Sequence, residues 1–394
     1  MRRKEIYSKS HPTPKLVEED AGLFHKKMNI AHSLSKVAIE GQRFLDGDEN
    51  ARKALVASAR ELVAVAEDPV ESLLWNIWAL PTRNVAARIA VDLKIFETAV
   101  VDDGRPKTIT DLAAPTGASP SLVKRIARIC ASMRMILEKQ PELYEPNNLT
   151  RLLAQKEYAA AIIFCFDCTQ LSFAQLPAYL KSTKFQNPEN TLDGPFQLAH
   201  NCGQAFGWLM EHPNVFQAFH LYANMLWIHR PSWLDMYSVR GKLVHELIDG
   251  EASSFVDVGG GTGQILQDFQ VRVPEYTGRL ILQDRPETVK GAHAYFMRYI
   301  LHDWPDEQCR AILGHLKDVM TPHYSRILIN DCVLADKEAA WQHVSLDLFM
   351  MAQTSAQERT ESEWRSLIGS CGLKVVHVYN KGEGNEGLIE VSLE

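Results

Sequence analysis

A glycine-rich turn directly after a short apolar segment limits the folds open to this chain of 394 residues more than any other feature. The turn reads Phe255-Val256-Asp257-Val258-Gly259-Gly260-Gly261-Thr262-Gly263-Gln264, and a helical pattern from Ile265 to Val271 follows. Glycine permits positive φ angles and lets a ligand approach the backbone closely. A buried strand that runs through such a turn into a helix is typical of a doubly wound α/β sheet.

The spacing of these glycines separates two classes of ligand. A dinucleotide site needs G-x-G-x-x-G, but here Gln264 or Leu266 stands where the last glycine belongs. The alternative pattern, acidic-x-G-x-G-x-G, is complete: it consists of Asp257, Gly259, Gly261 and Gly263, with Gly260 inside the turn. An acid at the strand end suits a ligand with an ammonium group and repels a pyrophosphate. The motif therefore predicts S-adenosylmethionine rather than NAD as the cofactor.

Strand-like and helical segments alternate from Ser253 to the C-terminus, which predicts a Rossmann-like class I domain with a mostly parallel sheet. The strand-like segments are SFVDV, RLILQ, AYFMRYI, RILINDCVL, LKVVHVY and GLIEVSL, and the last two are predicted to form a hairpin. Asp284 ends the second segment, 21 residues after Gly263. A carboxylate there can accept hydrogen bonds from both ribose hydroxyls of a nucleoside. The alternative is a plain turn residue before Arg285-Pro286.

A histidine at the end of the third strand-like segment is the candidate base. His302 lies in Tyr299-Ile-Leu-His-Asp-Trp-Pro305, at the edge where parallel strands present catalytic groups. Histidine titrates near neutral pH and can take a proton from a hydroxyl. A lone histidine after a strand is more often structural, but Asp331 closes the next strand at the same edge and Glu358 precedes a helix. An acid beside the imidazole fixes its tautomer and stabilises the imidazolium.

The N-terminal part has a different character. Residues 1–20 indicate a flexible tail and residues 22–67 helices, and the apolar helical stretch after Asp68-Pro69 is predicted to break at Pro81. Residues 108–153 then predict two helices and a small β-wing, a winged-helix pattern. Such a pattern often binds DNA, but the net charge of -7 argues against it, because phosphates require a basic face. Dimerisation or a wall of the substrate site is the favoured role.

Residues 156–250 are helical and rich in aromatic side chains, which belong to a core or line an apolar pocket. We expect no membrane-spanning segment, since no apolar stretch reaches about 18 residues. The start lacks the apolar run of a secretory signal. Cys165 and Cys168 form an isolated C-x-x-C, interpreted as buried thiols rather than a metal site. A reducing, cytoplasmic location fits the odd number of cysteines, seven.

From about residue 70 onward the chain resembles the plant- and fungal-type small-molecule O-methyltransferases, above all the fungal secondary-metabolism branch. The segments DVGGGTG, LILQD, RYILHDWPDEQCRAIL and QERTESEW match that family in order, and RPSWLDMYSV points to the fungal branch. The resemblance implies that His302 is the general base and that Asp331 and Glu358 flank it. It also implies that the glycine turn, Asp284 and Arg298 hold the cofactor, and that the winged-helix region forms a homodimer.

The chain departs from this family after Asp284. Only nine residues, RPETVKGAH, precede the next strand, where the family has roughly 25 to 30 more, with a helix, a third strand and a motif that packs on the adenine. The connection must cross the glycine-motif strand over about 20 Å. Nine extended residues span about 30 Å, so a loop can make the crossing but a full helix cannot. We expect a foldable core with a truncated cofactor pocket.

These observations predict an enzyme that methylates a hydroxyl of a small aromatic or polyketide-like metabolite, with no nucleic-acid or membrane partner and no metal. The alternative is a noncatalytic or repurposed relative, one that binds the cofactor weakly or runs a pericyclic or dehydration step. The predicted division is a tail and helical arm over 1–69 and a winged-helix-like dimerisation domain over 70–155. A helical connector with the substrate pocket follows over 156–245, and the cofactor domain occupies 246–394.

Overall fold

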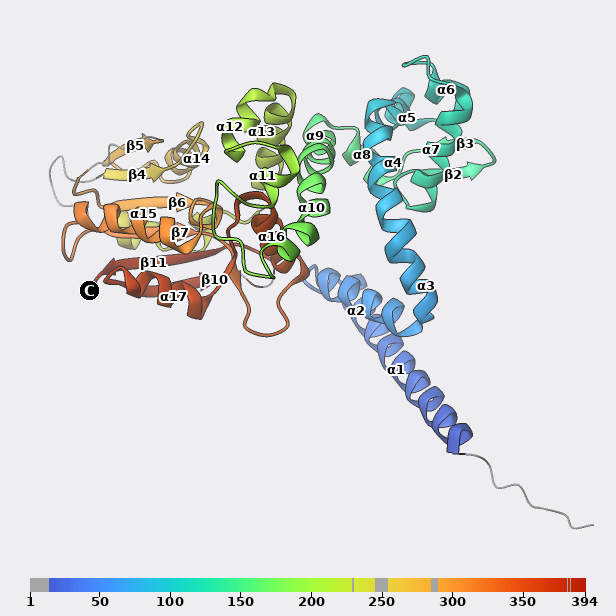
Figure 1. Ribbon diagram of the computed structural model, residues 1–394, viewed down its shortest axis with the longest axis horizontal. Helices are drawn as coiled ribbons and strands as arrows, with labels where there is room; N and C mark the ends of the chain where they lie inside the picture. The colour runs from blue at the N-terminus through green and yellow to red at the C-terminus, as the bar shows by residue number, and fades with distance from the viewer. Residues whose placement is uncertain (1–13, 229, 245–253, 285–289, 381, 383) are drawn as a thin grey trace, which may run out of the picture. The chain divides into compact units, whose positions relative to one another are not determined.

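The computed structural model describes residues 14–228, 230–244, 254–284, 290–380, 382 and 384–394. By internal contacts the chain divides into two compact units, residues 1–86 and 87–394 (Figure 1). The four-part division expected from the sequence stays a prediction. Of the nine residues after Asp284, residues 285–289 lie outside the described part, as does most of the predicted tail.

The first unit is a set of helices. Helix α1 (Pro14–Leu45) packs against α2 (Ala51–Ala66), and the ammonium of Lys36 lies 3.1 Å from the carboxylate of Glu61. Because α1 begins at Pro14, the flexible tail predicted over residues 1–20 was wrong for residues 14–20, and residues 1–13 lie outside the described part. Asp68 caps α3 (Pro69–Leu74) with a full capping box.

The break predicted at Pro81 was wrong. A π-helical turn, η1 (Trp75–Ala79), joins α3 to α4 (Leu80–Asp92), so the chain stays helical through the proline. Proline removes one backbone donor and its ring crowds the carbonyl four residues earlier. A widened turn just before Pro81 accommodates both effects without ending the helix.

The second unit opens with the expected winged-helix arrangement. Its helices are α5 (Ile95–Val100), α6 (Ile109–Ala113), α7 (Pro120–Ser132) and α8 (Asn148–Leu153). The wing is an antiparallel sheet of order β1-β3-β2, made of β1 (Lys107–Thr108), β2 (Leu137–Gln140) and β3 (Leu143–Glu145). Pro120 occupies the first turn of α7 after Ser119, as the sequence predicts.

A helical layer follows, with α9 (Lys156–Phe164), η3 (Cys165–Thr169) and α10 (Gln170–Ser182) in one continuous run. This 27-residue helix contains an 18-residue window of mean hydropathy 1.4 and is long and apolar enough to cross a membrane by length and composition alone. The expectation that no such stretch exists was therefore wrong. A core helix passes the same test, and here α13 (Pro213–Ile228) packs along α9. Along the chain, α11 (Pro195–His200) and α12 (Ala205–Glu211) lie between α10 and α13.

The C-terminal part contains the predicted mixed sheet, in the order β10-β11-β7-β6-β4-β5. Strands β5, β4, β6 and β7 are parallel, and β11 and β10 form the antiparallel hairpin at the other side. The strands are β4 (Ser254–Val258), β5 (Arg279–Gln283), β6 (Ala294–Arg298), β7 (Arg326–Asn330), β10 (Leu373–Asn380) and β11 (Gly387–Leu393). The mostly parallel doubly wound fold is confirmed.

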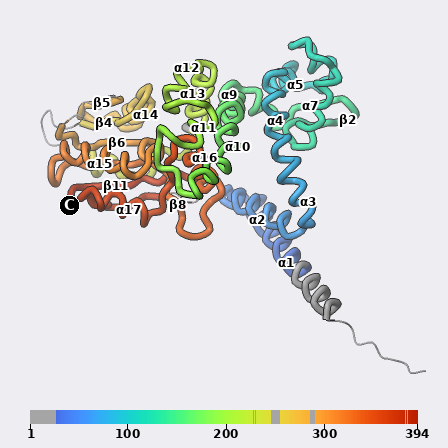
Figure 2. Tube along the Cα trace, viewed as in Figure 1, coloured from blue at the N-terminus to red at the C-terminus, as the bar shows by residue number. Residues whose placement is uncertain are grey.

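Helices cover both faces of this sheet (Figure 1). On one face, α14 (Gln264–Arg272) packs with Trp233 of η4 (Trp233–Asp235) on Phe255 and Phe296. On the other face lie α15 (Asp306–Val319) and α17 (Glu361–Ser370). Helix α16 (Trp341–Thr354) packs beside α10 and α11 instead, although these two helices come much earlier in the chain (Figure 2). Trp233 is thus a core residue of the sheet and not part of the helical layer.

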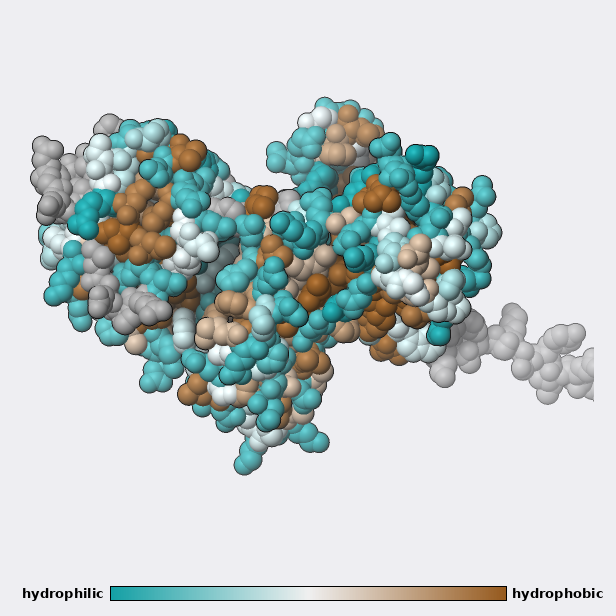
Figure 3. All heavy atoms as spheres, turned by 90° about the horizontal axis from the view of Figure 1, so that it is seen from above, coloured by the Kyte–Doolittle hydropathy of each residue, from teal (hydrophilic) through white to brown (hydrophobic). Residues whose placement is uncertain are grey.

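Strand β5 is the edge of the sheet within the described residues, and the route from β5 to β6 crosses β4 as expected. Leu282 of β5 is 44% exposed and Val271 of α14 is 78% exposed. Apolar surface is visible on the lobe that holds these elements (Figure 3). An exposed apolar edge strand is normally paired or covered, and no strand among the described residues pairs with this edge.

Candidate active site

The glycine turn joins β4 to α14, and Gly259, Gly261 and Gly263 all have positive φ angles. Two positions show different constraints. A Cβ on Gly260 would lie 2.3 Å from Oδ2 of Asp257, so this glycine makes room for the carboxylate beneath it. A Cβ on Gly261 would meet nothing within 4 Å, so this position faces open space. The turn is therefore closed toward the protein and open on one side, where a ligand can approach the backbone.

Asp257 lies under the turn and not on its surface. The residue is 1% exposed, and its Oδ2 atom has no hydrogen-bond partner in the described part of the chain. Burial raises the pKa of Asp257 to about 7, the negative charge of Asp284 adds to the rise, and Arg298 opposes it. Asp284 is exposed at the end of β5. The two acids thus stand at the carboxyl ends of neighbouring strands, as predicted, but only Asp284 faces outward.

His302 lies in η6 (Leu301–Asp303), a short turn after β6. Its Nδ1 atom is 2.8 Å from Oε1 of Glu358, whose side chain is fully buried. Its Nε2 atom is 3.5 Å from Oδ1 of Asp303. Only 8% of His302 is exposed. A histidine that donates from Nδ1 to a carboxylate presents Nε2 as the atom that exchanges protons.

Three carboxylates set the charge of this imidazole. Burial disfavours the imidazolium, but Asp303, Glu358 and Asp331 together outweigh burial and raise the pKa of His302 to about 9. Asp331 is fully buried, and neither of its carboxyl oxygens has a hydrogen-bond partner in the structure. Burial raises its own pKa to about 7, against the pull of His302. The structure therefore brings the three predicted catalytic residues together, and it adds Asp303, which the sequence analysis did not select.

A buried arginine holds the turn that carries His302. Arg359, 1% exposed, donates to Oδ1 of Asp306 at 2.8 Å and to the carbonyl oxygen of Trp304 at 3.1 Å. Its guanidinium also lies 5.1 Å from the ring centroid of Trp364. Arg359 directly follows Glu358, so one short segment both orients the imidazole and fixes the backbone beside it.

Arg298, predicted to contact the cofactor, is engaged by a residue that the sequence did not single out. Its Nε and Nη2 atoms lie 2.8 and 2.7 Å from the two carboxyl oxygens of Glu386, which also accepts from Arg230 at 3.0 Å. Glu386 is 3% exposed and lies just before β11. No local pattern marks it, because its partners are 88 and 156 residues away.

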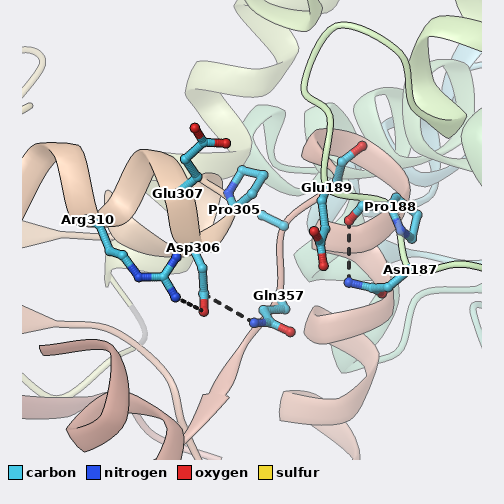
Figure 4. A pocket seen from close by; sticks show the side chains of 10 residues that line it. Asn187, Pro188, Glu189, Pro305, Asp306, Glu307, Arg310 and Gln357 are labelled. Carbon is cyan, nitrogen blue, oxygen red and sulfur yellow. Dashed lines mark hydrogen bonds and ion pairs between the residues drawn. The ribbon is translucent and has the colours of Figure 1, made fainter. Parts of the chain in front are cut away.

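Two cavities lie near the site without reaching the imidazole. The larger, about 420 Å³, is bounded by the loop at Asn187–Glu189, the start of α15 and the segment Ser355–Gln357 (Figure 4). Figure 4 shows Asp306 between Arg310 and Gln357, both of which donate to it. The smaller, about 140 Å³, lies beside Arg230, Trp233 and Arg298. His302 is not among the residues that line these two cavities.

The cysteines do not form a metal site among the residues that the structure describes. All seven thiols are free, and burial raises the pKa of Cys165 to about 11 and that of Cys168 to about 12. Thiols with such high pKa values are protonated at neutral pH and unreactive. The C-x-x-C lies in the π-helical turn η3.

Two family models match the chain. The O-methyltransferase domain matches residues 283–374, and the O-methyltransferase dimerisation domain matches residues 83–156. The O-methyltransferase mpaG of Penicillium brevicompactum is 31% identical over 393 residues, which cover 92% of this chain and 98% of the relative. This chain belongs to the O-methyltransferase family. A demethylsterigmatocystin 6-O-methyltransferase of Aspergillus flavus is 32% identical, over 77% of this chain and 84% of the relative.

Solved structures agree with this assignment. OxaC in complex with sinefungin and meleagrin superimposes with a TM-score of 0.82 at 23% identity, over 93% of this chain and 100% of OxaC. LepI in complex with SAM gives a TM-score of 0.80 at 25% identity, over 92% of this chain and 100% of LepI. The methyltransferase fold is thereby confirmed for this O-methyltransferase, and the ligand named with LepI is the cofactor that the glycine motif predicts for this chain.

The alignment with mpaG also shows how the two chains differ in length. The alignment has 393 positions. It includes 92% of the 394 residues of this O-methyltransferase, which is about 362 residues. About 31 aligned positions of the relative therefore have no counterpart in this chain.

Proposed function

We propose that this O-methyltransferase transfers a methyl group from S-adenosylmethionine to a hydroxyl of a small aromatic or polyketide-like metabolite, with His302 as the general base. The observation that carries the proposal is the 2.8 Å contact between Nδ1 of His302 and the buried carboxylate of Glu358. It orients the imidazole at the carboxyl edge of the sheet, where the glycine turn also lies. Asp331 adds negative charge that stabilises the imidazolium.

The cofactor and the protein residues would have separate roles in the reaction. Bound S-adenosylmethionine supplies an activated methyl group on a sulfonium, so the protein has to position the acceptor and remove one proton. The neutral imidazole takes the hydroxyl proton at Nε2, while Nδ1 keeps its hydrogen bond to Glu358. Asp303 and Asp331 then stabilise the imidazolium that forms. General-base catalysis of this kind contributes about 10²–10⁴-fold to the rate.

The residues at the glycine turn fit the predicted cofactor. We propose that Gly259, Gly260, Gly261 and Gly263 bring the backbone close to it, with Gly261 as the open position. The exposed Asp284 would accept hydrogen bonds from the ribose hydroxyls. Asp257 would support the turn from beneath and not touch the ligand, since it is packed under Gly260. Arg298 would act near the turn through its charge, which Glu386 partly neutralises.

We also propose that most of the 31 missing positions lie between Asp284 and β6. The nine-residue connection and the exposed edge strand β5 both support this placement. A cofactor pocket that lacks one wall would bind its ligand more weakly than in full-length relatives. A chain that fails to bind the cofactor at all would instead be the noncatalytic or repurposed relative considered above.

The region that matches the dimerisation domain would form a homodimer, with no nucleic-acid or membrane partner, in a cytoplasmic enzyme. The winged-helix elements then serve association and not base recognition, in keeping with the net charge of -7.

Calorimetric titration with S-adenosylmethionine and S-adenosylhomocysteine, followed by methyl transfer to a panel of phenols, tests the proposal. We expect binding of both ligands by wild type and by the variant His302→Ala, and turnover by wild type only. Full turnover by His302→Ala would overturn the role of the histidine. No binding at millimolar ligand would overturn the enzymatic function itself.

A further inference from the structure

Tyr299 is the first residue after β6 and lies three positions before His302. Its φ angle is +53°, in the left-handed region that a bulky residue rarely adopts. Its backbone amide donates to the carbonyl oxygen of Asn330 at 3.3 Å. The centroid of its ring lies 4.7 Å from that of the His302 imidazole. A strained backbone thus carries a phenol ring in contact with the candidate base, and strain of this kind concentrates at functional sites.

Two cations hold this ring. The guanidinium carbons of Arg230 and Arg298 lie 5.1 and 5.6 Å from the ring centroid of Tyr299, within the range of cation–π attraction. Both guanidiniums donate to Glu386, whose side chain is only 2% exposed. One buried carboxylate from the C-terminal hairpin therefore fixes both arginines, and the arginines fix the ring.

The hydroxyl of the Tyr299 ring forms no hydrogen bond with the described residues. The Oη atom of Tyr299 is shielded from solvent and has no hydrogen-bond partner among the residues that the structure describes. Both carboxyl oxygens of Asp331 and the Oε2 atom of Glu358 are in the same state around the same imidazole. Buried polar atoms nearly always have partners. A cluster of unpaired donors and acceptors beside the candidate base is therefore suited to a polar ligand, which would supply the hydrogen bonds that the protein itself does not make.

We propose that the Tyr299 hydroxyl binds a second oxygen of the methyl acceptor, adjacent to the hydroxyl that loses its proton to His302. This inference rests on the proposed function. It narrows the acceptor to phenols that carry a neighbouring hydroxyl or carbonyl oxygen. Tyr299 is then a specificity-determining residue, and Arg230, Arg298 and Glu386 are positioning residues that act through it.

Two coloured phenols test this inference without turnover. 4-Nitrocatechol has a second oxygen beside the acidic hydroxyl, and 4-nitrophenol lacks it. Spectrophotometric titration of the full chain with S-adenosylhomocysteine present should show that wild type prefers the catechol about tenfold, the contribution of one good hydrogen bond. Tyr299→Phe should reduce the preference to within about twofold, by weakening the binding of the catechol alone.

Tyr295 supplies a matched control on β6, the strand that ends just before Tyr299. Its hydroxyl accepts from the amide of Ala292 at 3.1 Å and donates to the carbonyl oxygen of Val319 at 3.2 Å. Tyr295→Phe should therefore lower the melting temperature and keep the catechol preference. Tyr299→Phe should leave the melting temperature unchanged or raise it, because no protein hydrogen bond is lost.

The outcomes are distinguishable. Retention of the preference in Tyr299→Phe, absence of a preference in wild type, or equal loss of the preference in Tyr295→Phe would each overturn this inference alone. Binding of neither phenol at 10 mM, about a hundredfold above a 0.1 mM dissociation constant, would overturn it together with the proposed function. Unchanged turnover in His302→Ala would overturn the role of His302 as general base. The dependence of the catechol preference on Tyr299 would still be supported by the binding data.

Discussion

The Nδ1 atom of His302 lies 2.8 Å from Oε1 of Glu358, a residue 56 positions further along the chain. This contact joins the turn after β6 to the segment before α17, so the orientation of the imidazole depends on the packing of two separate elements. It also leaves Nε2 as the atom for proton exchange.

Replacement of Glu358 by glutamine should lower kcat about 10²-fold. Loss of the orienting carboxylate lowers kcat about 10⁴-fold in the serine-protease triad, and here two further carboxylates remain near the imidazole. Cofactor affinity should not change. Steady-state kinetics and calorimetry measure both effects. Glu361→Gln, which alters an exposed carboxylate in the same segment, is the control and should keep the wild-type kcat. Wild-type kcat in Glu358→Gln would contradict the orienting role.

The pH dependence should follow the imidazole. Only neutral His302 accepts a proton, and its pKa is about 9, so kcat/KM should rise with pH and level off above about 9. Asp331→Asn removes a carboxylate that raises this pKa. The rising limb of its profile should therefore shift to lower pH. Profiles of wild type and variant between pH 6 and 10.5 test this, and a limb that stays in place would argue against His302 as the titrating base.

The glycine turn should tolerate a methyl group at neither Gly260 nor Gly261, for different reasons. Gly260→Ala places Cβ 2.3 Å from Oδ2 of Asp257, and such overpacking destabilises by about 1–3 kcal/mol. The Cβ of Gly261→Ala meets no neighbour. This variant should still be destabilised by about 1–2 kcal/mol, because alanine is strained in the left-handed backbone conformation, and its methyl group should block cofactor binding. Gly314 of α15 also has open space, and Gly314→Ala should stabilise by about 0.5–1 kcal/mol.

Chemical denaturation and calorimetry separate these three variants. Full cofactor affinity in Gly261→Ala would show that the open side of the turn does not face the ligand.

Arg359 should matter for both stability and activity. Removal of one partner from a buried ion pair destabilises by about 3–5 kcal/mol, and Asp306 is partly exposed, so we expect about 3 kcal/mol for Arg359→Met. Because Arg359 binds carbonyl groups of the turn that holds His302, kcat should fall as well. Arg365→Met breaks an exposed pair on α17 and serves as the control. Equal stability of the two variants in urea denaturation would contradict this account.

Restoration of the missing segment should strengthen the cofactor site. A chimera with the segment of mpaG that follows its second strand, inserted between Asp284 and β6, covers the exposed edge of β5. We expect at least about tenfold tighter binding of S-adenosylhomocysteine, equal to about 1.4 kcal/mol, and a higher melting temperature. Unchanged affinity in a folded chimera would mean that other residues already complete the pocket.

Much of the fold and part of the site were predictable from local sequence. The glycine turn, the six strands of the mixed sheet along the chain, the winged-helix elements and His302 after β6 all follow from short patterns. These patterns succeed because turns, caps and strand periodicity depend on residues a few positions apart. The same local rules were wrong at Pro81, where a π-helical turn kept the helix intact.

The tertiary structure alone decided which side chains meet. Glu386 binds Arg298 and Arg230 across 88 and 156 residues, and no spacing in the sequence predicts that pair. Asp257 was expected to face the ligand, but packing under Gly260 turned it inward. The unpaired hydroxyl of Tyr299 is also a result of packing, since it depends on what surrounds the ring. Local patterns determine backbone conformation, whereas burial and long-range pairing depend on how the sheet and its helices assemble.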